Sequence, residues 1–105
     1  MIDWARINEL KGEVGEDAVA EVVEIFFEEV DDAMAALGSA ATPDSLADAL
    51  HFLKGSAQNV GMTDVSDACA AQEGEVRAGN RTVADLSTIR SALNTARSDL
   101  MAGLR

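Results

Sequence analysis

Apolar residues recur along most of the chain at intervals of three and four, which is the spacing of amphipathic α-helices. The pattern predicts helices over residues 3–11, 16–37, 42–61, 63–79 and 82–100, and no segment shows the alternation typical of a strand. Long helices joined by short connections pack as antiparallel neighbours. The sequence therefore predicts an all-α fold, an antiparallel up-down-up-down four-helix bundle with a short N-terminal capping helix.

Local signals predict where these helices begin and end. Thr42 is placed to cap the third helix, with Pro43 at its first position, and Thr82 with Asp85 has the spacing of a capping box for the fifth. Glycines predict the ends of the first four helices: Gly12, Gly38, Gly61 and Gly79.

The apolar stripes also predict the core. Its expected members are Trp4, Ile7, Leu10, Val19, Val23, Phe26, Val30, Ala33, Leu37, Leu46, Leu50, Leu53, Ala57, Val60, Val65, Cys69, Gln72, Val76, Leu86, Ile89, Leu93, Ala96 and Leu100. Cys69 is thus expected to be a small core residue rather than a reactive thiol. Phe27 and Phe52 fall outside these stripes, so each either fills a groove between helices or stands exposed as a docking anchor.

His51 is the only histidine, and it points away from the leucines of its own helix. Lys54, Gly55 and Gln58 follow it by three, four and seven residues, so they share its direction to within about 60°. A glycine inside a helix costs about 0.8 to 1 kcal/mol relative to alanine. Access to the imidazole ring is a physical reason for Gly55 at this position, although an incidental surface histidine fits the spacing as well.

Seven positions of this region form one short pattern: His51, Leu53, Lys54, Gly55, Asn59, Val60 and Gly61. The pattern resembles the signature of histidine-containing phosphotransfer (HPt) domains. Similar residues also occur at 3–10, 24–29, 69, 73 and 77–79, so the resemblance covers essentially the whole chain. It implies that His51 accepts a phosphoryl group, that Lys54 screens its charge, that Gly55 leaves space for it, and that Gln58 offers a donor at the rim.

The resemblance further implies a residue that hydrogen-bonds the non-phosphorylated nitrogen of the His51 ring. Glu73 matches that position in the family. Such a bond would fix the tautomer of the ring and leave its other nitrogen free. The neighbouring Gln72 is a rival for this role, and a solvated glutamate is the alternative interpretation of Glu73.

The chain carries neither a P-loop nor a kinase-type glycine loop, so we expect a phosphocarrier that cannot use ATP itself. The resemblance implies a phosphorelay intermediate of two-component signal transduction, with a hybrid histidine kinase and response-regulator receiver domains as partners. It implies no cofactor on this chain, because Mg²⁺ is expected on the partner receiver domain. Two alternatives stay open: a helical adaptor that docks receivers without being phosphorylated, and the histidine-bearing module of a chemotaxis-type kinase.

Composition limits the remaining possibilities. The 105 residues predict a single domain over 1–105, and the net charge of −11 argues against nucleic acid and anionic membranes as partners. Nine carboxylates and no cation occur from Glu13 to Asp32, which is typical of a solvated helix face. No membrane span or signal peptide is recognisable, so we expect a cytoplasmic monomer.

Overall fold

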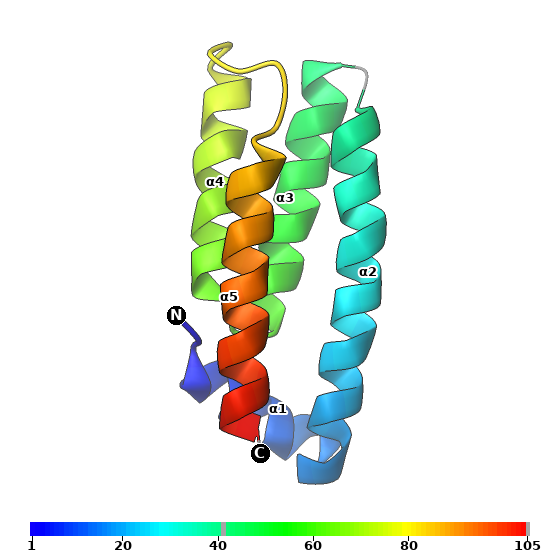
Figure 1. The fold of residues 1–105 in the computed structure, drawn as a ribbon, viewed down its shortest axis with the longest axis vertical. Helices are drawn as coiled ribbons and strands as arrows, with labels where there is room; N and C mark the ends of the chain where they lie inside the picture. Colours follow the sequence, from blue (N-terminus) through cyan, green and yellow to red (C-terminus); the bar gives the residue numbers. More distant parts are fainter. Residues whose placement is uncertain (41, 105) are drawn as a thin grey trace.

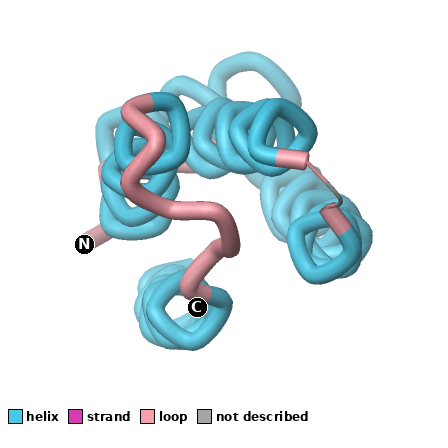
Figure 2. Tube along the Cα trace, turned by 90° about the horizontal axis from the view of Figure 1, so that it is seen from above, coloured by secondary structure: helices cyan, strands magenta, loops and turns pink. Residues whose placement is uncertain are grey.

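A computed structural model describes residues 1–40 and 42–104. It contains α1 (Trp4–Val14), the short 3₁₀ helix η1 (Glu16–Ala18), α2 (Val19–Ser39), α3 (Pro43–Asn59), α4 (Thr63–Arg77) and α5 (Leu86–Leu104). The four long helices run antiparallel in a bundle 42 Å long and 21 Å across, and α1 lies across one end of it (Figures 1 and 2). The predicted fold class is confirmed. The predicted domain includes Ala41 and Arg105, which lie outside the described residues.

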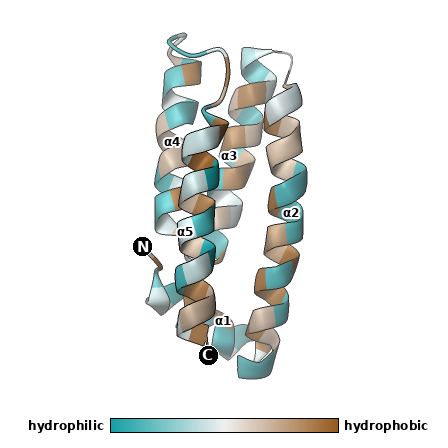
Figure 3. Cartoon of the chain, in the orientation of Figure 1, coloured by the Kyte–Doolittle hydropathy of each residue, from teal (hydrophilic) through white to brown (hydrophobic). Residues whose placement is uncertain are grey.

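The core fills the space enclosed by the four long helices, where the apolar positions face one another (Figure 3). Nearly all of the predicted core residues are buried, including Cys69 and Gln72. Trp4 and Leu86 are the exceptions. The Trp4 ring lies over Gly103 near the end of α5, outside the core, and stays 40% exposed. Leu86 is half-buried at the first position of α5. No helix among the described residues is long and apolar enough to cross a bilayer.

Two of the glycines predicted to end helices lie inside them. Helix α1 continues through Gly12 and ends at Gly15, whose φ of +88° is the left-handed conformation that glycine adopts readily. Helix α2 continues through Gly38 to Ser39, whose hydroxyl donates to the carbonyl of Ala35 at 3.0 Å. A glycine ends a helix where the backbone turns to positive φ, and the backbone at Gly12 and Gly38 does not do so.

Of the two predicted N-terminal caps, the one at Thr42 is confirmed and the one at Thr82 is not. The Thr42 side chain accepts a hydrogen bond from the Ser45 backbone at 3.1 Å, with the expected proline at the first position of α3. The predicted capping box of the fifth helix is wrong. Asp85 itself caps α5, since its carboxylate accepts from the Thr88 backbone at 3.0 Å, and Thr82 lies in the preceding loop.

The turn after α3 is joined to the N-terminal segment. The backbone N–H of Asp3 donates to the carbonyl of Gly61 at 2.7 Å, and Arg6 donates to both the backbone and the side-chain oxygen of Asn59 at 2.9 Å. Gly61 has a φ of +74°, and a Cβ there would lie 2.8 Å from the Asp3 carbonyl oxygen. The last glycine of the sequence pattern therefore has a structural reason, because it lets α1 close the end of the bundle.

Candidate functional site

The site is centred on His51, at the middle of α3. Its neighbours Leu50 and Leu53 are fully buried, whereas the His51 side chain is 63% exposed. The exposure predicted from the helical angle is therefore confirmed. The ring stands on the outer surface of α3, and one edge of it faces α4.

Glu73 on α4 is the residue beside the ring. Its two carboxylate oxygens lie 3.3 and 3.2 Å from Nδ1 of His51, and its side chain is only 10% exposed. Gln72 points elsewhere, because its amide exchanges two hydrogen bonds with the backbone of Asp85, at 2.7 and 3.2 Å. The geometry thus answers the question that the sequence left open: Glu73, and not Gln72, contacts the histidine.

Two cations hold the Glu73 carboxylate. Arg77, one helical turn further along α4, donates from Nε to Oε2 at 2.9 Å, and Lys54 Nζ lies 3.4 Å from Oε1. Burial raises the pKa of Glu73, but the Arg77 hydrogen bond and the Lys54 charge outweigh it, so the pKa lies below its ordinary value. Glu73 is therefore an ionised carboxylate near neutral pH.

This ionisation fixes the chemistry of the ring. An ionised carboxylate can only accept hydrogen bonds, so the Nδ1 that faces it carries a proton. In a neutral imidazole the lone pair then resides on Nε2. The arrangement offers an oriented nucleophilic nitrogen on an open surface.

The other predicted site residues lie on the same helix. Gly55 is exposed, and a Cβ added there would meet no atom within 4 Å, so this side of the ring is open. Gln58 is exposed further along α3, and no hydrogen bond joins it to His51 in the described part of the chain. Lys54 lies closer to the carboxylate than the sequence suggested, because its ammonium pairs with Glu73.

Arg77 is the residue that sequence reasoning missed at this site. It pairs with Glu73 and also lies 3.7 Å from Asp48 on α3, so it joins the two helices beside the histidine. Its position four residues after Glu73 on one helix was the available signal. Among the described residues, no group of acidic, histidine or cysteine side chains is placed to hold a metal ion.

The two aromatic residues left open by the sequence differ in the structure. Phe27 is buried: its ring packs edge-on against Phe26, with centroids 5.3 Å apart, and the Arg97 guanidinium lies 4.7 Å from its centroid. A docking role for Phe27 is therefore excluded, because this side of α2 is covered by α5. Phe52 is 58% exposed and directly follows His51.

A family model described as Hpt domain matches residues 21–99. The chain belongs to the Hpt domain family. The matched region comprises all five predicted site residues. Comparison with curated proteins and with solved structures gave no match. Hpt domains are phosphocarriers rather than independent kinases, and they act in phosphorelays through receiver domains.

Replacing Arg77 tests whether it keeps the Glu73 carboxylate ionised in this Hpt domain. Because the Arg77 hydrogen bond is the largest contribution lowering the pKa of Glu73, Arg77→Ala should raise that pKa, as measured by NMR titration of the side-chain carboxyl. A depressed carboxyl pKa stabilises the fold above the unfolded-state value of about 4.3, and this contribution is lost as the pH falls through the folded-state value. Acid unfolding linked to Glu73 should therefore begin at higher pH in the variant.

Arg90 on α5 provides the matched control for this substitution. It is an exposed arginine, and no contact joins it to Glu73 within the described residues. Arg90→Ala should leave the titration of Glu73 where it is in the wild type. An unchanged Glu73 pKa in Arg77→Ala would contradict the role given to Arg77.

Proposed function

We propose that this Hpt domain accepts a phosphoryl group on His51 from the aspartyl phosphate of one receiver domain and passes it to an aspartate of another. The observation that carries the proposal is the exposed ring of His51 with its Nδ1 held by a buried, ionised Glu73. A hybrid histidine kinase is the expected source of the first receiver. The single-domain organisation over residues 1–105 belongs to the same proposal.

The transfer needs no reactant on this chain other than the imidazole of His51. The lone pair on Nε2 attacks phosphorus, the bond from phosphorus to the aspartate oxygen breaks, and the electron pair of that bond leaves with the carboxylate. Phosphoryl transfer relies mainly on positioning and on electrostatic stabilisation. Glu73 stabilises the positive charge that develops on the ring. Lys54 pairs with the same carboxylate and is the cation we expect to screen the phosphoryl oxygens. Mg²⁺ is expected on the receiver.

The main alternative is a helical adaptor that binds receiver domains without being phosphorylated. The two functions differ in one observable, because only a phosphocarrier acquires a phosphoryl group from a phosphorylated receiver. Incubation with receiver domains carrying labelled aspartyl phosphate should transfer an acid-labile label to this chain. Binding without transfer of label to the chain would favour the adaptor.

We expect Gly55→Gln to slow phosphoryl transfer while the fold keeps or gains stability. A side chain at this position has free space within the monomer, so the substitution should gain up to about 1 kcal/mol of helix propensity. The same side chain stands one helical turn beyond His51, where it would obstruct an approaching receiver. The measurements are the rate of transfer from a phosphorylated receiver and a denaturant melt.

Gly12→Gln is the control for this variant. Gly12 also lies in a helix with open space around it, but on α1, which lies across one end of the bundle and carries none of the site residues. It should gain similar stability and transfer at the wild-type rate. Wild-type transfer by Gly55→Gln would show that the space beside the ring is not needed.

A further inference from the structure

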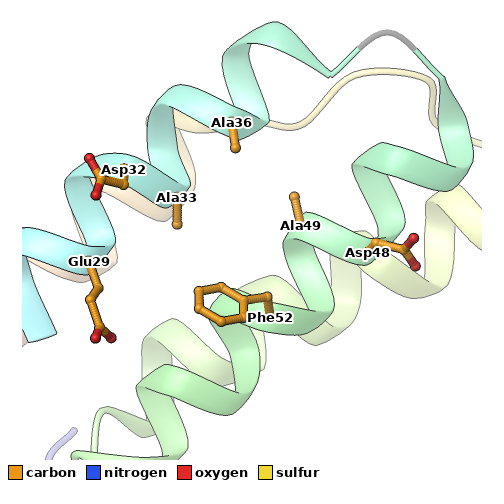
Figure 4. Close-up of a pocket in the computed structure, with 7 residues that line it drawn as sticks. All are labelled: Glu29, Asp32, Ala33, Ala36, Asp48, Ala49 and Phe52. Carbon is orange, nitrogen blue, oxygen red and sulfur yellow. The ribbon is translucent and has the colours of Figure 1, made fainter.

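A groove of about 560 Å³ runs between α2 and α3, next to the histidine surface. Small side chains from both helices form its floor, namely Ala33 and Ala36 of α2 and Ala49 of α3, and Phe52 projects into it (Figure 4). We call this feature the α2–α3 groove. Because its floor consists of methyl groups, the backbone of another helix could approach closely there.

The exposed apolar surface of the groove continues along the two helices. Phe52 is 58% exposed, and Ile25, which lines a neighbouring hollow between α2 and α3, is 49% exposed. Glu29 borders both hollows. Large apolar side chains exposed this closely together mark a surface that a partner covers.

The groove lies beside His51, the proposed site of phosphoryl transfer. Phe52 directly follows His51, and Asp48 precedes His51 by one helical turn. A specific protein interface covers roughly 800 Å² on each partner, which is far more than one imidazole ring offers. A receiver seated over His51 must therefore cover an adjoining surface, and the α2–α3 groove offers an apolar one.

The charged residues that line the groove are all acidic. Its lining includes the carboxylates of Glu29, Asp32 and Asp48, all exposed, and the whole chain carries a net charge of −11. Asp48 lies 3.7 Å from Arg77, whereas no cation of the described residues pairs with Glu29 or Asp32. A partner with Lys or Arg beside an apolar stripe would complement this rim, and an acidic one would be repelled.

We propose that Glu29 and Asp32, in the lining of the α2–α3 groove, select receiver domains that carry basic residues beside the apolar surface with which they cover Phe52. This inference rests on the proposed function, since the receiver is the partner that reaches His51. It adds the charge chemistry by which one receiver is preferred over another. The Phe52 ring supplies the apolar anchor, and the two carboxylates supply discrimination.

The test is phosphoryl transfer from a panel of purified receiver domains, measured at low and at high ionic strength. The charge-reversal variant Glu29→Lys/Asp32→Lys should lower kcat/KM for receivers with a basic docking surface by about 10-fold or more at low ionic strength. This difference should shrink as salt is added, because exposed charges are screened. Phe52→Ala should lower kcat/KM at both ionic strengths.

Glu24→Lys/Glu28→Lys is the matched control, with the same change of charge on exposed positions of α2 that do not line the groove. A transfer rate in the groove variant equal to that of this control would overturn the selection by Glu29 and Asp32 and leave the proposed transfer intact. Failure of every receiver to label the wild type would overturn both proposals. Sedimentation of the wild type as a dimer that the groove variant disperses would assign the groove to a second copy, and so overturn a receiver as its occupant.

Discussion

His51→Gln should abolish phosphoryl acceptance and leave the fold intact. The ring provides the only imidazole of the chain, and glutamine offers no comparable nucleophile, so labelling from a phosphorylated receiver should fall to background. The side chain is 63% exposed and contributes nothing to the core, so helix content and the midpoint of denaturation should change little. Labelling and a denaturant melt on the same preparation measure both effects.

Replacing Leu50, the residue before His51, should lower stability but keep phosphoryl acceptance. Leu50 is fully buried, so Leu50→Ala should cost about 2 to 5 kcal/mol of unfolding free energy. At temperatures where that variant remains folded, it should still accept label. Retained labelling of His51→Gln would show that another residue is the acceptor, and a large loss of its stability would show that the ring supports the fold.

Gly61→Ala should cause a loss of stability of about 2 kcal/mol or more. An alanine at a φ of +74° is strained, and its Cβ would lie 2.8 Å from the carbonyl oxygen of Asp3, where backbone must shift to make room. For a domain of this size such a loss lowers the melting temperature by roughly 8 °C or more. Thermal melts followed by circular dichroism measure the effect.

Gly55→Ala is the contrasting variant, because both glycines belong to the same sequence pattern. A Cβ at Gly55 meets no atom within 4 Å, so alanine there should be neutral or stabilise the fold by up to about 1 kcal/mol. If Gly61→Ala melted at the wild-type temperature, the close contact between the N-terminal segment and the turn after α3 would not exist in solution.

The fold and the exposure of His51 could be predicted because both follow from helical periodicity. Stripes at intervals of three and four determine which side of each helix is buried, and His51 lies opposite the stripe of α3. The ends of helices were less predictable. Gly12 and Gly38 resemble stop signals, yet both are compatible with helix, and only backbone that turns to positive φ needs a glycine, as at Gly15.

The features that could not be predicted from the sequence depend on contacts between segments that are far apart along the chain. The structural role of Gly61 depends on Asp3 passing beside it, and the two are far apart in the sequence. Gln72 is held away from the histidine because its amide bonds the backbone of Asp85 in the loop before α5. Periodicity states which side of a helix is exposed, but it does not state which other helix lies beside that side.

The buried side of Phe27 illustrates the same limit. It lies outside the main stripe of α2, and it is buried because α5 packs against that flank, where Arg97 covers the ring. Phe52 lies at a comparable angle on α3, but the α2 residues that line the groove with it include Ala33 and Ala36, whose short side chains leave the ring uncovered. The sequence alone did not distinguish these two environments.

In the proposed function, Glu73 holds Nδ1 of His51 and leaves Nε2 as the nucleophile. The most direct measurement is NMR of the phosphorylated chain with ¹⁵N-labelled histidine, in which coupling to phosphorus identifies the nitrogen that carries the phosphoryl group. We expect a single phosphohistidine, at position 51, bonded through Nε2. A phosphoryl group on Nδ1, or on any residue other than His51, would contradict it.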